Sequence, residues 1–187
     1  LGARFAHVLA KAGARVILTA RRLDKLETIA NEIRRKGFDA VPIIMNVAQK
    51  KSVQKVISKL TTQGEKIDIL VNNAGIAKFT PIFELDTQNN FESIMQTNVM
   101  GIWYVTQFTA MHMKDNSIKG SIINIASING TTKLGKNITG YCVSKAAVIQ
   151  LTKALVGELS EAKIRINCIV PGLFPTPLTD SYLSILE

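Results

Sequence analysis

Short apolar runs alternate with amphipathic stretches along the chain, and this alternation limits the possible folds more than any other feature. Five runs are expected to be strands, at residues 14–20, 40–47, 67–75, 120–127 and 163–170. Several of them are almost continuously apolar, which is typical of strands buried on both faces of a parallel sheet. The regular strand-helix order therefore predicts an α/β fold with helices around a parallel sheet.

Helical spacing of apolar residues fills the intervals between these runs. The helices are expected at residues 3–13, 23–37, 52–64, 88–114 and 141–161. In the second of them, for example, Leu26, Ile29 and Ile33 recur on one face. The 187 residues contain no internal repeat and no linker. We therefore expect one domain, residues 1–187, with a doubly wound parallel sheet and helices on both of its faces.

The composition excludes several classes of protein. The formal net charge is +9, but the Lys and Arg residues are scattered over loops and expected helix ends. This pattern indicates a solvated surface, so we expect no nucleic-acid partner, although charge alone keeps that reading open. No apolar run reaches the roughly 18 residues of a membrane span, so we expect no membrane partner. Cys142 and Cys168 form no C-x-x-C motif and lack a histidine at metal spacing, which predicts reduced thiols, no metal site and a cytoplasmic protein.

The stretch GYCVSK places Tyr141 four residues before Lys145, where a helix is expected to begin. Residues four apart lie on the same helix face, so the phenol and the ammonium can share a site. A nearby positive charge favours the phenolate and is expected to lower the pKa of Tyr141. A tyrosine tuned in this way can act as a general acid or base near neutral pH.

Several polar residues and glycines lie at the end of an expected strand or just beyond it. In open parallel sheets, ligands bind beyond the carboxyl ends of the strands, so these residues are expected near one another. They are Arg21 and Arg22, Asn46 and Val47, Asn72 to Gly75, Ser127, and Pro171 with Gly172. Tyr141 and Lys145 open the helix after the Ser127 loop and can reach the same edge.

Four motifs occur in a fixed order: N-N-A-G after one strand, a serine after the next, then Y-x-x-x-K, and finally P-G. In this order the chain resembles the short-chain dehydrogenase/reductase family, in particular a 3-oxoacyl-reductase-like member. The resemblance implies an NAD(P)-binding, Rossmann-like domain. It also implies that Tyr141 is the general acid or base, that Lys145 lowers its pKa and binds the nicotinamide ribose, and that Ser127 polarises the substrate carbonyl. Asn98 matches the helix asparagine that holds a water for the proton relay.

The same resemblance implies which residues bind the cofactor. Asn72, Ala74, Gly75, Pro171 and Gly172 are expected to line the cleft, together with Tyr141 and Lys145, and Thr176 matches a threonine that contacts the carboxamide. Gly2 matches the last glycine of the family's phosphate loop. The first strand and the rest of that loop are therefore expected to precede Leu1, and a further segment is expected after Glu187.

Two arginines determine which dinucleotide we expect. Proteins of this kind that bind NAD have an acidic residue at the end of the second strand of the family's fold, where it binds the ribose 2′-hydroxyl. In this chain that strand is residues 14–20. This chain has Arg21 and Arg22 there, and guanidinium groups match a phosphate in charge and geometry. NADP(H) is therefore favoured over NAD(H). Asn46 and Val47 stand beside the expected adenine, where the family often has Asp-Val.

The leading hypothesis is an NADPH-dependent oxidoreductase that reduces the carbonyl group of a small molecule to an alcohol. Reductases of 3-oxoacyl thioesters and dehydrogenases of sugars or polyols are the nearest functional types. The alternative is a regulatory protein of the same fold that binds the nucleotide without turnover. Helices 88–114 and 141–161 carry more apolar residues than one sheet face needs, and the matching helices of the family pack between subunits, so a homotetramer or homodimer is expected.

Overall fold

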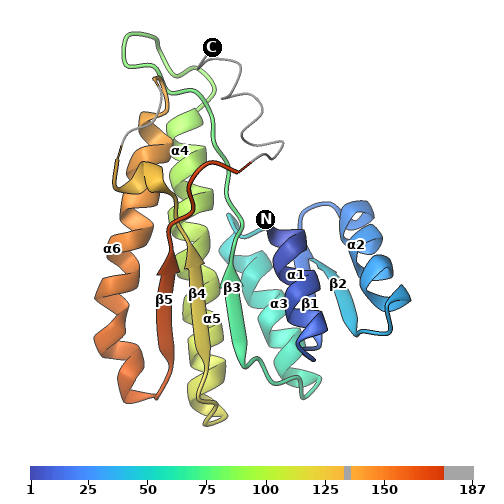
Figure 1. Ribbon diagram of the computed structural model, residues 1–187. Helices are drawn as coiled ribbons and strands as arrows, with labels where there is room; N and C mark the ends of the chain where they lie inside the picture. Colours follow the sequence, from blue (N-terminus) through green and yellow to red (C-terminus); the bar gives the residue numbers. More distant parts are fainter. Residues whose placement is uncertain (133–135, 175–187) are drawn as a thin grey trace.

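The computed structural model describes residues 1–132 and 136–174 and confirms the predicted alternation of strands and helices (Figure 1). The strands are β1 (Val16–Ala20), β2 (Ala40–Ile44), β3 (Ile69–Asn72), β4 (Ser121–Ile125) and β5 (Arg165–Ile169). Every pair of neighbouring strands is parallel. Their carboxyl ends therefore share one edge, as the sequence predicts.

The helices agree with prediction except where one long helix was expected. They are α1 (Gly2–Lys11), α2 (Leu23–Arg35), α3 (Lys50–Thr62), α4 (Asn90–Met95), α5 (Gly101–Asp115) and α6 (Thr139–Glu161). A π-helix, η1 (Gln96–Met100), separates α4 from α5, and a short 3₁₀-helix, η2 (Ile128–Gly130), follows β4. The expected helix 88–114 is thus three segments, because a π-turn interrupts the α-helical hydrogen bonds.

The strands form two parallel sheets among the described residues, β1-β2 and β3-β4-β5. The backbone groups of successive residues in a strand point to opposite sides. The amide of Val16 donates to the carbonyl of Asp39, on the β2 side of β1. The carbonyl of Asp68 accepts from the amide of Ser121, on the β4 side of β3. The alternate residues of β1 and β3, such as Ile17 and Val71, consequently direct their backbone groups toward the space between the sheets. The parallel α/β architecture is confirmed, but its sheet is divided at this point.

Apolar clusters define the layers. Helices α1 and α2 pack on one face of β1-β2 through Ala10, Ala30 and Ile33, which are almost fully buried. Helix α3 packs on the opposite face and also reaches β3, so it bridges the two sheets. Helices α5 and α6 cover the same face of β3-β4-β5. Figure 1 shows α3, α5 and α6 behind the strands and α1 in front.

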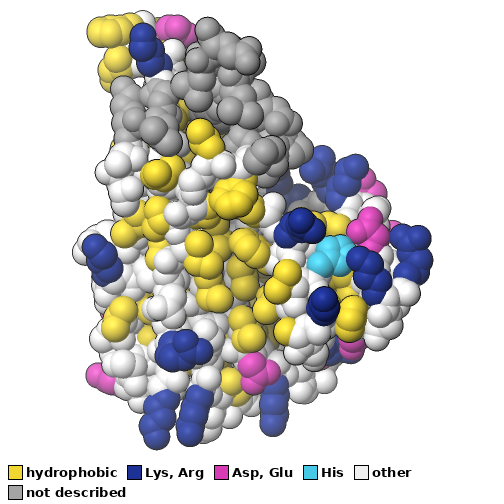
Figure 2. Space-filling view, in the orientation of Figure 1, with side chains coloured by type: hydrophobic (Ala, Val, Ile, Leu, Met, Phe, Trp, Pro, Cys, Tyr) yellow, Lys and Arg dark blue, Asp and Glu magenta, His cyan; other side chains and the backbone are white. Residues whose placement is uncertain are grey.

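The front of the three-stranded sheet is not covered by a helix of the described residues. Ile69 of β3 and Ile169 of β5 are each almost half exposed there, at 46% and 45%. Figure 2 shows hydrophobic side chains gathered over this part of the surface. The expected helices on both faces are therefore present around β1-β2, whereas β3-β4-β5 has helices on one face within the described part.

A buried polar ladder crosses the three-stranded sheet. The side-chain amide of Asn72 donates to Thr106 at 3.0 Å and to Asn124 at 2.8 Å. The amide of Asn124 in turn donates to Thr152 at 3.0 Å. Each of these side chains is buried and paired, so the ladder ties β3 and β4 to helices α5 and α6 without leaving an unsatisfied amide. The side chain of Asn72 therefore faces the core and not the expected cofactor cleft.

Candidate active site

Ser127 is the second residue after the end of β4, and its backbone is extended (φ −164°, ψ 154°). Its hydroxyl accepts from the amide of Asn129 at 3.2 Å and so starts the turn of η2. Backbone bonds hold both neighbours, because Ala126 donates to Ile169 at 2.8 Å and Ile128 donates to Pro171 at 2.9 Å. The Ser127 hydroxyl is thereby fixed at the carboxyl edge of β4 and β5.

Gly130 lets this turn approach helix α6. A Cβ at position 130 would lie 2.7 Å from the backbone carbon of Lys145 and 2.8 Å from its oxygen. Such contacts are shorter than real Cβ atoms tolerate, so a side chain here would push η2 away from α6. The glycine brings the Ser127 loop against the helix that carries Tyr141 and Lys145.

Tyr141 and Lys145 lie on the first two turns of α6, as predicted. Lys145 is 4% exposed, and its ammonium donates to the carbonyl of Ile125 at 2.8 Å, at the end of β4. Its nitrogen lies 5.7 Å from the centre of the Tyr141 ring. The lysine is thus held by the sheet, with its charge beside the ring of the tyrosine.

The pKa values of these two groups move in directions set mainly by burial. Burial raises the pKa of Tyr141, and a hydrogen bond with Ser127 opposes that rise. Burial also lowers the pKa of Lys145 to about 8, because the ammonium is removed from water. The sequence predicts a net lowering of the Tyr141 pKa, whereas burial of the phenol raises it overall.

Asn98 lies in the π-helix η1 and is fully buried. Its amide oxygen accepts from the backbone of Ile76 at 2.8 Å, and its amide nitrogen donates to the carbonyl of the same residue at 2.9 Å. The nitrogen also donates to Ser144 at 3.0 Å. Ser144 passes the connection on, because its hydroxyl donates to the carbonyl of Tyr141 at 2.8 Å. Asn98 therefore joins the loop after β3 to the turn that carries Tyr141.

Gly75 occupies the meeting point of these groups. A Cβ at this position would lie 3.3 Å from the amide oxygen of Asn98 and 3.4 Å from the nitrogen of Lys145. Gly75 and Ala74 are both exposed, so this part of the N-N-A-G turn faces outward. The structure thus brings Gly75, Asn98, Ser127, Tyr141 and Lys145 together at one edge.

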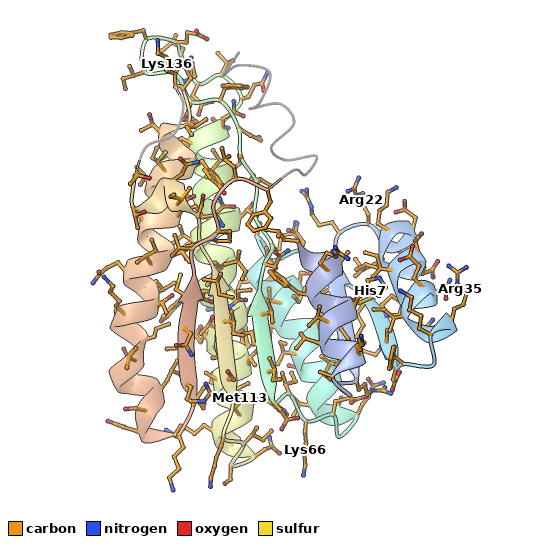
Figure 3. The ribbon with its side chains drawn as sticks, in the orientation of Figure 1. His7, Arg22, Arg35, Lys66, Met113 and Lys136 are labelled. Atoms are coloured by element: carbon orange, nitrogen blue, oxygen red, sulfur yellow. The ribbon has the colours of Figure 1, made fainter. Side chains whose placement is uncertain are left out.

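The other predicted cofactor residues lie along the same edge at different distances from this group. Gly2 opens α1 beside the N-N-A-G turn, because a Cβ there would lie 2.7 Å from the side-chain nitrogen of Asn73. Arg21 and Arg22 are exposed beyond β1, and Figure 3 shows Arg22 at the start of α2.

Asn46 and Val47, beyond β2, are each partly used by the fold. The amide oxygen of Asn46 accepts from Ala48 at 3.1 Å, and Val47 packs against Gly101 of α5, where a Cβ would lie 2.9 Å from its methyl group.

Three positions beyond β5 belong to the prediction. Pro171 is partly buried and its carbonyl holds the Ser127 loop, while Gly172 is exposed. Thr176 lies outside the described residues.

Two contributors to the site were missed by sequence reasoning, Gly130 and Ser144. A serine directly before the lysine of Y-x-x-x-K is a visible signal for Ser144, whereas the contact that requires Gly130 is made only by the tertiary fold.

The amino-acid sequence matches a known protein family. The family profile described as short chain dehydrogenase matches residues 1–184. The chain therefore belongs to the short-chain dehydrogenase/reductase family, whose members are NAD(P)-dependent oxidoreductases acting on CH-OH or C=O groups.

Individual relatives agree with this assignment. A short-chain type dehydrogenase/reductase from Mycobacterium marinum has a similar structure, with a TM-score of 0.92 and 36% identity over 98% of this chain and 72% of that one. A gluconate 5-dehydrogenase from Burkholderia cenocepacia, solved in complex with NADP and tartrate, gives a TM-score of 0.88 and 32% identity over 95% and 69%. A 3-oxoacyl-[acyl-carrier-protein] reductase from Thermotoga maritima is 30% identical over 92% of this chain and 69% of its own length.

None of the helices in residues 1–132 and 136–174 has the length and apolar character that crossing a membrane requires.

The buried Lys145 predicts a pH-dependent stability. Its pKa is about 8 in the folded protein against 10.5 for the free side chain, so between these values the unfolded chain binds more protons and the free energy of unfolding rises with pH. The variant Lys145→Met lacks this titrating ammonium group. The stability of the wild type minus that of the variant should rise by about 2 kcal/mol between about pH 7 and about pH 9.5 in urea unfolding.

The exposed Lys153 on the same helix supplies the control for this experiment. The stability of the wild type minus that of Lys153→Met should stay nearly constant over the same pH range. A Lys145 difference that is equally flat would show that its ammonium is not buried as described.

Proposed function

We propose that this protein reduces the carbonyl group of a small molecule to an alcohol with NADPH as reductant. The observation that carries the proposal is the placement of Ser127, Tyr141 and Lys145 at one sheet edge, with hydrogen-bonding groups and a cation around one phenol. Hydride transfer to a carbonyl needs a donor of one proton at the developing alkoxide, and this group of side chains provides it.

Tyr141 acts as the general acid in this proposal. Because its pKa lies above the ordinary value, the phenol is protonated at neutral pH and ready to donate to the carbonyl oxygen. The hydroxyl of Ser127 donates a second hydrogen bond to the same oxygen. The ammonium of Lys145 beside the ring stabilises the phenolate that remains. Oxidation of an alcohol, the reverse reaction, needs the phenolate and should therefore be favoured by higher pH.

The residues present fit a nicotinamide dinucleotide. The ammonium of Lys145 has three N–H donors, and among the described residues it donates to the carbonyl of Ile125, so it can also bind a ribose hydroxyl. Gly75 and Ala74 present an open surface next to it, and Gly2 begins a helix whose amino end can face a phosphate. When bound, the reduced nicotinamide supplies the hydride.

The proposed substrate class is supported by the names of relatives and not by a pocket of this chain. The relatives described above are named for 3-oxoacyl groups and for gluconate, both of which involve a ketone or the corresponding secondary alcohol. We propose that ketones of these two types are reduced, and a panel of 3-oxoacyl thioesters and keto-gluconates is the first screen. Failure to reduce any compound despite nucleotide binding would favour a regulatory protein without turnover.

Tyr141→Phe tests the proposed acid. The variant keeps the ring but lacks the proton, so kcat for the best ketone of the panel should fall by at least about a hundredfold. NADPH binding, followed by fluorescence, should change by less than about threefold. Tyr104→Phe, on the partly buried face of α5, is the matched control and should keep full activity. Unchanged turnover by Tyr141→Phe would reject the mechanism.

Arg21→Asp tests the proposed preference for NADPH. The exposed side chain of Arg21, beyond β1, can contact the 2′-phosphate of NADPH. A carboxylate at this position would repel that phosphate and would accept a hydrogen bond from the ribose 2′-hydroxyl of NADH. The ratio of the dissociation constants for NADH and NADPH should fall by at least about tenfold, which corresponds to about 1.4 kcal/mol. Arg34→Asp, at an exposed site on α2, should leave the ratio unchanged. An unaltered preference in Arg21→Asp would overturn the assignment of this residue.

We also propose that one more parallel strand lies between β1 and β3 and joins the two sheets. The support is that β1 and β3 each lack a strand partner on one side within the described part of the chain, together with helix α3, which already packs on both sheets. In the protein this strand would precede Leu1 and lead through the phosphate loop into Gly2. It would pair with the backbone groups of Ile69 and Val71, which point away from β4.

Hydrogen exchange tests the added strand in the protein as its gene encodes it. The amides of Ile69 and Val71 should exchange as slowly as that of Leu70, which points toward β4. Fast exchange limited to Ile69 and Val71 would show an open edge and refute the proposed strand.

We further propose a homodimer or homotetramer assembled through α5 and α6. The support is that Met111 on α5 and Val143 and Val156 on α6 are 55%, 43% and 50% exposed, so a subunit interface on these helices would cover apolar side chains. Light scattering of the purified protein decides this, since the mass of a single chain would reject it. A cytoplasmic location stays a prediction from the sequence.

A further inference from the structure

Helix α6 begins without a cap of its own. The residue at its N-cap position is Ile138, whose apolar side chain cannot accept a hydrogen bond from the first-turn amides. Ile138 is 1% exposed and Gly140 is also buried, so water has little access to the amide of Gly140. A helix normally satisfies one of these amides with a Ser, Thr, Asp or Asn at the N-cap. The missing acceptor must therefore come from elsewhere in the fold.

Thr80 supplies it from a loop 60 residues earlier in the chain. The hydroxyl of Thr80 accepts from the amide of Gly140 at 2.9 Å, and the bond is buried. Gly140 is the second residue of α6, which is the position that an N-cap side chain usually serves. The backbone fixes the acceptor in place, because the amide of Thr80 donates to the carbonyl of Asn137 at 2.7 Å and Thr80 pairs with Ile138 in a parallel bridge.

Packing makes the same contact specific. A Cβ at Gly140 would lie 3.1 Å from Phe91, 3.2 Å from Ile94 and 3.3 Å from the methyl group of Thr80. The first turn of α6 therefore sits close against α4 and Thr80, and a side chain at position 140 would require these neighbours to shift. Thr80 itself is 9% exposed.

The turn that Thr80 caps is the turn that carries Tyr141. Lys145 lies one turn later and is anchored to Ile125 of the sheet, so fraying of the first turn would move the phenol without moving the ammonium. The segment from Ile76 to Thr80 is also held at its other end by Asn98. Resting on the proposed function, we infer that Thr80 is a positioning residue that holds the Tyr141 phenol in register with Ser127 and Lys145.

Thr80→Val tests this inference, because valine keeps the shape of threonine and removes the acceptor. In the protein as its gene encodes it, kcat for the best ketone should fall about ten- to a hundredfold, as expected for a displaced acid. The dissociation constant of NADPH should stay within about twofold. Thr80→Ser restores the hydroxyl and should return kcat to within about threefold of the wild type. A loss of kcat with unchanged nucleotide binding and rescue by serine separates positioning from general destabilisation.

Thr109→Val is the matched control. Thr109 is a fully buried threonine of α5 whose hydroxyl has no partner among the residues that the structure describes. The same substitution there should leave kcat unchanged. A Thr80→Val protein with the kcat of the wild type, beside an inactive Tyr141→Phe, would overturn the positioning role and leave the proposed function standing. An active Tyr141→Phe would instead overturn the proposed function, and the positioning role with it.

The wild type provides a second test if Thr80→Val does not fold. The amide of Gly140 should show slow hydrogen exchange, because its bond to Thr80 is buried. Exchange at the rate of an unprotected amide would show that the cap is absent in solution and would overturn the inference.

Discussion

The common direction of the strands is the constraint on which the site depends. Because every paired strand is parallel, their carboxyl ends lie on one edge, and residues as distant in sequence as Gly75, Ser127 and Pro171 are brought to it. Helix α6 starts from the same edge and brings Tyr141 and Lys145. The bond from Lys145 to Ile125 then connects the helix directly to the end of β4. The chemistry proposed here is a consequence of that topology and of few additional contacts.

Most of the architecture could be predicted from the sequence. The alternation of apolar runs with helical periodicity indicated each of the five strands, because burial on both faces leaves a strong pattern. The grouping of Ser127, Tyr141 and Lys145 was also predictable, since each follows a strand or opens a helix at that edge, whereas Asn98 was predicted only from the family resemblance. Strand ends were less accurate. Residues 73–75 were expected in β3, but the chain already turns there as Asn73 bonds back to Val71.

The features that escaped prediction depend on tertiary contacts. The pKa of Tyr141 is set by how deeply the phenol is buried, and spacing along a helix does not carry that information. Asn72 belongs to a motif associated with cofactor binding, yet its side chain is used by the buried ladder to Thr106 and Asn124. The acceptor for the α6 amide lies 60 residues away. Local rules for helix caps examine neighbours in sequence and therefore overlook Thr80.

The π-helix η1 divides what would otherwise be one continuous rod into two segments with different angular phase. One residue corresponds to about 100° of rotation around an α-helix axis. The extra residue in the wider turn allows α4 to face the start of α6 while α5 faces α3. Asn98 lies at this change of phase. A shorter variant that lacks Thr97 would keep every apolar side chain in the chain and yet direct one of the two segments toward the wrong neighbour.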